Sequence, residues 1–169
     1  MGISFGSVSK KPYVGSKEVT EAYVGSQLVY RATPPYKYYF LGTENDYILD
    51  NSVITLSTQR AAITKDGGIY RIALTSASYG TPGYVRVNLT NTTFTFIARV
   101  QTTISNPTIY IQMYNGDTYN EASSYRVNAP SSYTLFTVNV PSYINNVRIA
   151  HNSGSSSTTY VDAIKSDLE

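Results

Sequence analysis

The sequence predicts an all-β protein: a C-terminal antiparallel β-sandwich of the jelly-roll type, preceded by a small N-terminal β-hairpin element. Many short segments of strand-like composition follow one another at even spacing, with turn residues between most of them and no convincing helix. Within several segments apolar and polar residues alternate. The chain also has 17 tyrosines and no tryptophan, and tyrosine favours strands and exposed recognition surfaces.

The hairpin element is predicted from two near-copies of one phrase, at residues 13–19 and 23–29, each beginning Tyr-Val-Gly-Ser. Each copy has the pattern of a strand, a Gly-Ser turn and a return strand, so we expect hairpins over residues 3–31. An isolated hairpin is marginally stable in water, and this element therefore needs a partner. We expect residues 1–33 to serve in attachment or oligomerisation.

The paired prolines Pro34 and Pro35 interrupt this region, because proline cannot continue a β-ladder. The second predicted domain is the β-sandwich, 34–169, whose strands begin after residue 36. Its expected strands are 37–41, 53–57, 69–75, 83–89, 93–101, 108–114, 124–128, 134–140, 146–151 and 159–165.

Turn-forming residues lie between most of these segments, among them residues 66–68, 79–83, 115–117 and 152–154. Alternation predicts which side of each strand packs inward. Val85 and Val87 alternate with polar or aromatic residues, as do Ile109 and Ile111. The segment from 93 to 101 is predicted as a central core strand because it carries Phe94, Phe96, Ala98 and Val100 on one side.

Composition excludes several classes of function. The net charge is only +2, and the 13 basic residues are scattered, so no nucleic-acid partner is expected. Cysteine is absent, which removes disulfides, thiolate metal sites and cysteine nucleophiles and fits synthesis in a reducing cytoplasm. No segment resembles a signal peptide, and none approaches the ~18 consecutive apolar residues of a membrane span.

Enzymatic activity is not expected, and no cofactor is predicted beyond a structural ion considered below. The single histidine, His151, has no nucleophile beside it in the sequence and is interpreted as a surface or hydrogen-bonding residue. No nucleophile elbow, phosphate loop or zinc-binding helix motif occurs. The most obvious acidic residues lie in turns or near the C-terminus, where they suit turn formation or solvation.

A binding site is predicted on the outward faces of two strands. The aromatic rings offer stacking surfaces for the C–H faces of sugars, and the arginine and amide groups offer planar hydrogen-bonding partners for hydroxyls. The alternative is that these side chains cover a sheet or fill a subunit interface. The glycan-binding candidates are Tyr84, Arg86, Asn88, Tyr110, Gln112 and Tyr114.

Two resemblances accompany this pattern. The repeated Tyr-Val-Gly phrase, over roughly the first thirty residues, resembles one in structural proteins of phages and prophages of Gram-positive hosts. The segments Val147–Ala150 and Tyr160–Ile164, with a Ser/Gly loop between them, resemble the closing strands of jelly-roll carbohydrate-binding modules. The chain departs from that pattern at Ala163, where an aspartate is usual, and in having no tryptophan for sugar stacking.

The second resemblance also implies a structural Ca²⁺, which jelly-roll modules often hold near their first and last strands. Glu44, Asp46, Asp50 and Asp162 would approach one another if those strands pair. The alternative is that they are surface acids of a loop, since no calcium-loop spacing occurs.

Together the resemblances imply a phage virion protein, such as a head or tail fibre or a receptor-binding subunit. Residues 1–33 would dock onto other virion proteins or form a homo-oligomer, for which the resemblance implies a trimer, while the sandwich binds host-surface polysaccharide. Such a protein would be made in the host cytoplasm and released by lysis. The alternatives are a purely structural decoration or spacer protein and a bacterial polysaccharide-binding module.

Overall fold

The chain is described here by a computed structural model that covers residues 1–169. It describes residues 13–14, 17–18, 21–24, 27–31, 36–44, 47–76, 81–90 and 92–167. The chain divides into two compact units, Met1–Pro35 and Tyr36–Glu169. Every regular element in the described ranges is a strand, and none of these residues lies in a helix that is long and apolar enough to cross a membrane.

The first unit contains two short antiparallel strand pairs that coincide with the two copies of the repeated phrase. Strand β1 (Tyr13–Val14) pairs with β2 (Lys17–Glu18), and β3 (Glu21–Val24) pairs with β4 (Gln27–Arg31). The Gly-Ser dipeptides between the strands of each pair lie outside the described residues. The attachment role expected for this unit stays a prediction.

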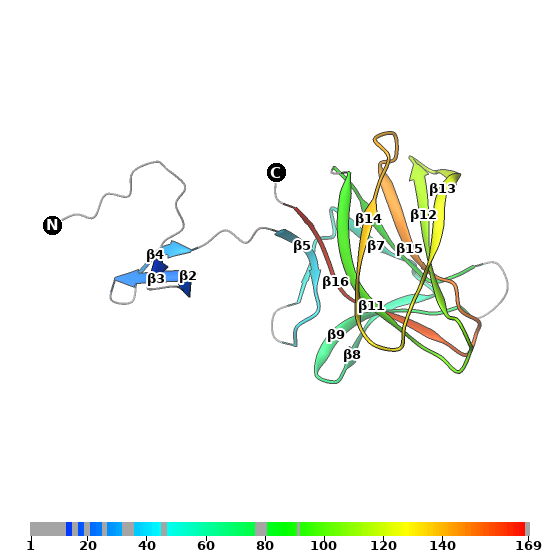
Figure 1. Cartoon of the computed structure of the whole chain (residues 1–169), viewed down its shortest axis with the longest axis horizontal. Helices are drawn as coiled ribbons and strands as arrows, with labels where there is room; N and C mark the ends of the chain where they lie inside the picture. The colour runs from blue at the N-terminus through cyan, green and yellow to red at the C-terminus, as the bar shows by residue number, and fades with distance from the viewer. Residues whose placement is uncertain are drawn as a thin grey trace. The chain divides into compact units, whose positions relative to one another are not determined.

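The second unit is a sandwich of two antiparallel sheets, whose strands can be followed in Figure 1. The five-stranded sheet has the order β13 (Thr118–Asn128), β12 (Thr108–Asn115), β15 (Asn146–His151), β10 (Tyr84–Asn88) and β7 (Ile54–Leu56). The seven-stranded sheet contains β14 (Thr134–Asn139), β11 (Thr93–Gln101), β16 (Thr158–Asp167), β5 (Tyr36–Leu41) and β6 (Ile48–Leu49) in that order. Its remaining strands are β9 (Ile69–Leu74), which also pairs with β16, and β8 (Ala61–Asp66), which pairs with β9. The predicted all-β sandwich is confirmed.

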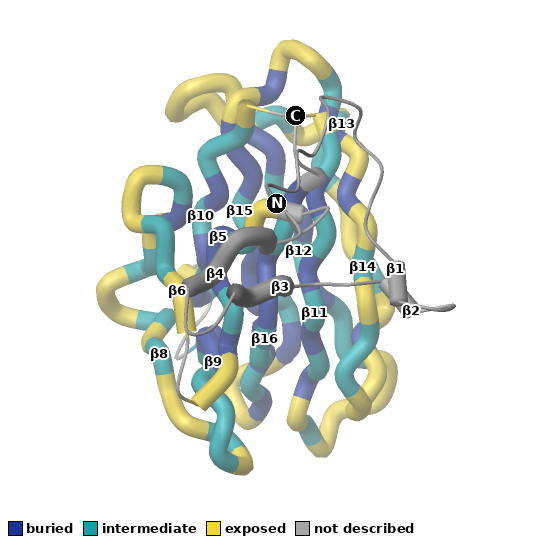
Figure 2. Tube along the Cα trace, turned by 90° about the vertical axis from the view of Figure 1, so that its left-hand side faces the viewer, coloured by how far each residue is buried: buried dark blue, intermediate teal, exposed yellow. Residues whose placement is uncertain are grey.

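The hydrophobic core lies between the two sheets. The alternation predicted for β11 is confirmed, since Phe94, Phe96, Ala98 and Val100 are all buried. The five-stranded sheet contributes the inward residues of β10, β12 and β15, which include Val85, Ile111 and Ile149. Figure 2 shows buried positions running along the central strands, with exposed positions gathered at the loops. Because side chains alternate along a strand, the polar and aromatic residues between these positions lie on the outer faces.

Three strands, β6, β8 and β13, differ from the predicted set. Strands β6 and β8 were not predicted, because β6 has only two residues and β8 is an edge strand with a largely exposed, mixed composition. Strand β13 begins at Thr118 rather than at residue 124, since the hairpin turn between β12 and β13 is confined to Gly116 and Asp117. Gly116 has a φ of 59°, which suits glycine in a tight turn.

The start of β10 is fixed by a close backbone crossing at Gly83. Its N–H donates to the Thr75 carbonyl at 2.6 Å, and its own carbonyl accepts from the His151 N–H at 2.8 Å. A Cβ at this position would lie 1.9 Å from the Arg60 carbonyl oxygen. Only a glycine therefore permits this crossing, which places the next residue, Tyr84, on the five-stranded sheet.

Substitution of Gly83 by alanine is expected to lower the free energy of unfolding by at least about 1–3 kcal/mol. The added Cβ would collide with the backbone carbonyls of Arg60 and Thr75, which cannot move aside as the end of a side chain can. Chemical denaturation measures the loss. Gly154→Ala is the matched control, because its Cβ would meet only the tip of the exposed Ile104 side chain. Equal stability losses for the two variants would show that the crossing at Gly83 is not tight.

Candidate functional site

The six predicted glycan-binding residues lie on the outer face of the five-stranded sheet. They come from β10 and β12, which do not pair directly, because β15 runs between them. Tyr84 and Tyr110 are both register partners of Ala150, Arg86 and Gln112 both face Arg148, and Asn88 and Tyr114 both face Asn146. Register partners in an antiparallel sheet point to the same side, so these residues form three short rows across one face.

Strand β15 adds a central arginine to this face. The guanidinium carbon of Arg148 lies 4.4 Å from the ring centroid of Tyr84 and 4.1 Å from that of Tyr114. Both distances are within the range of cation–π attraction, which weakly hydrated guanidinium groups favour. Arg148 thus links the tyrosines of β10 and β12 that the sequence predicted separately.

Strand β13 extends the face with Tyr119 and Arg126. Tyr119 is the register partner of Tyr114, and the two ring centroids are 5.4 Å apart. The hydroxyls of Tyr110 and Tyr119 form a hydrogen bond, which together with burial raises the pKa of Tyr110 to about 12. Arg126 lies opposite Tyr110, with its guanidinium 5.3 Å from the ring centroid.

We call this surface the tyrosine–arginine face. Its side chains differ in exposure: Tyr84 and Tyr110 are half-buried, Tyr119 is 38% exposed and Tyr114 only 8%. The side chains of Asn88, Gln112 and Arg148 have no hydrogen-bond partner among the described residues. The face therefore combines aromatic rings with unused hydrogen-bonding capacity. It comprises the six predicted residues together with Tyr119, Arg126 and Arg148.

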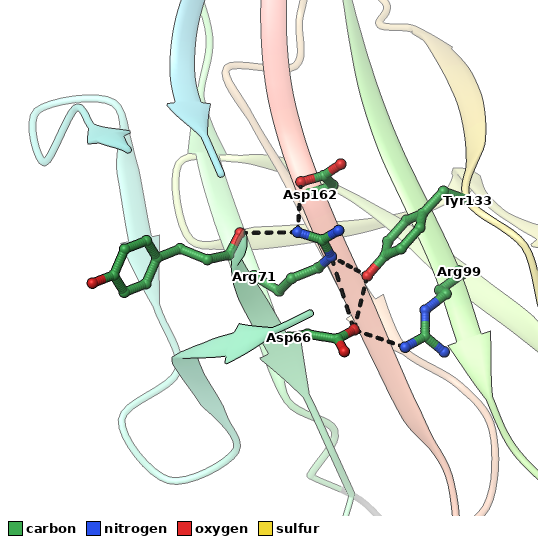
Figure 3. Close-up of polar contacts among 6 residues, drawn as sticks. Asp66, Arg71, Arg99, Tyr133 and Asp162 are labelled. Carbon is green, nitrogen blue, oxygen red and sulfur yellow. Dashed lines mark hydrogen bonds and ion pairs between the residues drawn. The ribbon is translucent and has the colours of Figure 1, made fainter. Parts of the chain in front are cut away.

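The seven-stranded sheet carries a different arginine cluster on its own outer face, drawn in Figure 3. Arg71 of β9 is 6% exposed, and its Nη1 lies 3.1 Å from Asp162 Oδ1 of β16. Arg99 of β11 donates from Nη2 to Asp66 Oδ2 at 2.7 Å. The Tyr133 hydroxyl accepts a hydrogen bond from Arg71 and donates to Asp66 at 3.2 Å.

Two aspartates neutralise these two arginines. The hydrogen bond from Arg99 is the main cause that lowers the pKa of Asp66. Burial raises the pKa of Asp162, although the Arg71 guanidinium opposes this shift. The cluster is closed by its own partners and exposes no unpaired guanidinium, and we interpret it as structural.

The carboxylates proposed for calcium do not gather in the described part of the chain. Strands β5 and β16 do pair, as that prediction required. Asp162 nevertheless contacts Arg71, Glu44 lies 2.5 Å from Lys65 Nζ, and Asp50 accepts hydrogen bonds from Ser52 that lower its pKa. Asp46 lies outside the described residues, and no group of three metal-ligating side chains occurs among those that are described. A structural calcium at these four residues stays a prediction.

His151 is a hydrogen-bonded core residue rather than a surface one. Its ring is buried, and Nδ1 lies 2.8 Å from the Thr159 hydroxyl, while Nε2 lies 3.3 Å from Ser157 Oγ. Burial lowers the pKa of His151, so the ring is neutral at pH 7.

A hollow of about 420 Å³ lies elsewhere on the sandwich and is lined by Thr92, Thr93, Asn139, Val140 and Pro141. None of these five lining residues has an aromatic or charged side chain.

Sequence reasoning missed Arg148, Arg126 and Tyr119. The alternation of β15, with Val147 and Ile149 inward, already placed Arg148 outward. Its position between Tyr84 and Tyr114 depends on β15 lying between β10 and β12, which no local pattern reveals. Tyr119 was missed because the predicted strand began at residue 124, six residues after the observed start of β13 at Thr118.

Comparison with known proteins gives a fold and no family. No family model and no curated protein matches the sequence. Among solved structures, the chain is similar to a family 29 carbohydrate-binding module, with a TM-score of 0.53 and 12% identity over 77% of this chain and 86% of that one. It is also similar to the K2 cleaved adhesin domain of Lys-gingipain, with a TM-score of 0.53 and 11% identity over 79% and 99%.

A further similar structure is a family 29 module variant complexed with cellohexaose, with a TM-score of 0.50 and 9% identity over 79% of this chain and 92% of that one. At these identities the comparisons show the fold alone. They confirm the jelly-roll sandwich that the closing strands of the sequence indicated.

We expect Asp66→Asn to lower the free energy of unfolding at pH 7 by about 1–2 kcal/mol. This is at the low end for hydrogen bonds to a charged group, because the Asp66 side chain is 34% exposed. The pKa of Asp66 is lower in the folded state than its ordinary value of 3.8, so the carboxylate stabilises the fold above pH 3.8 and this contribution is lost as the pH falls further.

The difference between variant and native chain should therefore shrink at pH 3, as measured by urea denaturation at both pH values. Asp117→Asn makes the same change at a side chain that is 93% exposed and is expected to alter stability little. A loss of the same size at pH 3 and pH 7 for Asp66→Asn would contradict this account.

Proposed function

We propose that the second unit, Tyr36–Glu169, is a carbohydrate-binding domain that recognises a polysaccharide through the tyrosine–arginine face. The observation that carries this proposal is that Asn88, Gln112 and Arg148, whose side chains have no hydrogen-bond partner among the described residues, lie on the same face as the rings of Tyr84, Tyr110 and Tyr119. Aromatic faces stack on sugar rings, and planar amides and guanidiniums bind hydroxyl pairs.

The geometry supports binding without large rearrangement. Stacking against Arg148 and the hydrogen bond to Tyr119 hold three of the tyrosine rings in place, so little side-chain freedom is lost on binding. The face is nevertheless part of an open sheet, and an open sheet buries little of a ligand. We therefore expect each site to bind weakly and repeated copies to supply avidity.

The similar structures are consistent with a ligand-binding role for this sandwich. One of them is complexed with cellohexaose, and others are variants at tyrosine, arginine, lysine or aspartate made to probe ligand recognition. These are the residue types, apart from lysine, that are found on or beside the tyrosine–arginine face. The similarity does not place a ligand on this chain.

The biological setting is a second part of the proposal. The N-terminal repeat resembles that of phage structural proteins, and the chain divides into two compact units, of which the repeat belongs to the first. We infer that residues 1–33 attach the chain to a virion or form its oligomer, and that the sandwich faces host polysaccharide. The alternative, a decoration or spacer protein, would use the same tyrosines as a subunit contact, because tyrosine and arginine are also enriched at interfaces.

Tyr119→Ala is expected to weaken polysaccharide binding roughly tenfold, since loss of one stacked ring removes about 1.4 kcal/mol of contact. The full chain is first screened on an array of bacterial and plant polysaccharides, and affinities for the best ligand are then measured by isothermal titration calorimetry. Tyr119 is already 38% exposed, so the melting temperature should change little.

Tyr47→Ala is the matched control, because Tyr47 is 44% exposed and contacts Tyr70 of the other sheet. It should bind as the native chain does. Unchanged affinity in Tyr119→Ala would remove the tyrosine–arginine face as the site. If no polysaccharide binds and Tyr119→Ala instead changes the oligomeric state, the structural alternative replaces the proposal.

A further inference from the structure

Two arginines lie directly opposite each other on the tyrosine–arginine face. Arg86 of β10 and Arg148 of β15 are register partners in an antiparallel pair, and both lie on the outer side of the sheet. Like charges in directly opposed positions destabilise a sheet. A sequence selected for stability alone would place an acid or a neutral residue at one of these positions, and such local conflicts are typical of functional sites.

The protein itself does little to neutralise this pair. Arg148 has no carboxylate or hydrogen-bond partner among the described residues, and its guanidinium lies over two tyrosine rings. Arg86 contacts Asp117 at 3.4 Å, but that side chain is 93% exposed and free to be displaced. The Nε atoms of Arg86 and Arg148 are both buried without a partner.

The third arginine of the face is not neutralised either. Arg126 is the third arginine of this face, and it has no ion pair in the described structure. On the opposite sheet, by contrast, Asp66 and Asp162 neutralise Arg71 and Arg99. Between these two outer faces, the described arginines are therefore neutralised by aspartates on the seven-stranded sheet and largely left without carboxylates on the five-stranded sheet.

We propose that the Arg86–Arg148 pair binds an oxyanion of the ligand, so that the polysaccharide recognised by this face is acidic. This inference rests on the proposed function and specifies its ligand class. The acidic group is a carboxylate of a uronic acid or a phosphate of a polymer backbone, and either presents oxygens that two guanidinium groups can share.

The tyrosines explain why the pair is stable enough to exist before the ligand arrives. Cation–π contacts with Tyr84 and Tyr114 compensate part of the repulsion and hold the Arg148 guanidinium in a fixed plane. An arriving anion thus meets an arranged site and relieves a repulsion, which gives it an advantage that a neutral sugar lacks.

The test compares polygalacturonate with its fully methyl-esterified form, which has the same backbone without charge, and with poly(glycerol phosphate). Calorimetry with the full chain should give at least about tenfold tighter binding to a charged polymer than to the ester, the effect of one charge-assisted contact. Added NaCl should weaken only the charged interaction.

Arg86→Gln and Arg148→Gln should each reduce the preference for the charged polymer about tenfold. Lys37→Gln removes an equal charge from the other sheet and should leave the preference unchanged. Arg86→Gln is expected to melt no lower than the native chain, because it removes the like-charge contact, and its result therefore stands even if Arg148→Gln is unstable.

Asp117→Asn provides a test in the opposite direction. Removal of this competing carboxylate should strengthen binding of the charged polymer several-fold and leave binding of the ester unchanged. A stronger response to poly(glycerol phosphate) than to polygalacturonate would identify phosphate as the anion that the pair binds.

Equal affinity for polygalacturonate and its ester, without any preference for poly(glycerol phosphate), would overturn the inference and leave carbohydrate binding intact. An unaltered preference in Arg86→Gln would overturn it as well. If neither these polymers nor any neutral polysaccharide binds, the proposed function fails and this inference fails with it.

Discussion

The sandwich depends on one strand, β16, being paired along both of its edges. One edge pairs with β11, and the other pairs first with β9 and then with β5, so that segments from three distant parts of the chain meet on one strand. The register with β11 shifts where Ile97 faces Ala163 and Ala98 faces Val161, which leaves Asp162 as an extra residue. Such a bulge redirects a side chain, and here it directs the carboxylate to the buried Arg71. The non-local pairings must form together, so we expect folding to be slow relative to a helical protein of this size.

Local patterns predicted the strands and their faces well where alternation was strong. The predicted bounds of β10, β11 and β12 differ from the observed bounds by one residue at most, and the buried side of each strand is the predicted one. The six candidate residues were therefore placed on the correct side of their strands, although their role as a site stays a prediction. Local patterns did not predict the order of strands, because strand order is set by contacts between distant residues. For that reason Arg148 was overlooked. The acidic residues proposed for calcium were likewise grouped without their basic partners, which are Lys65 for Glu44, Lys37 for Asp50 and Arg71 for Asp162.

The two outer faces show how the same residue type serves two purposes. Arg71 and Arg99 have carboxylates within reach, and their charge is used within the protein to join β8, β9, β11 and β16. Arg126 and Arg148 have no carboxylate partner among the described residues, and their guanidinium groups lie over aromatic rings. A ring attracts a guanidinium without neutralising it, so the charge stays available to a molecule outside the protein. The partner of an arginine, rather than its presence, separates a structural cluster from a candidate site.

The pairing of Tyr36 with Asp167 has a consequence for how nature can use this sandwich. The first and last strands of the second unit, β5 and β16, lie side by side and run in opposite directions. The point where the chain enters this unit and the point where it leaves are therefore about one strand spacing apart, ~5 Å. Both strands belong to the sheet opposite the tyrosine–arginine face. A gene segment encoding residues 36–167 is thus suited to insertion into a surface loop of another protein. The two ends of the inserted domain would separate the flanking residues of that loop by no more than the two ends of a β-hairpin do. The same geometry favours circular permutation through a short linker between the two ends, leaving the outward face untouched.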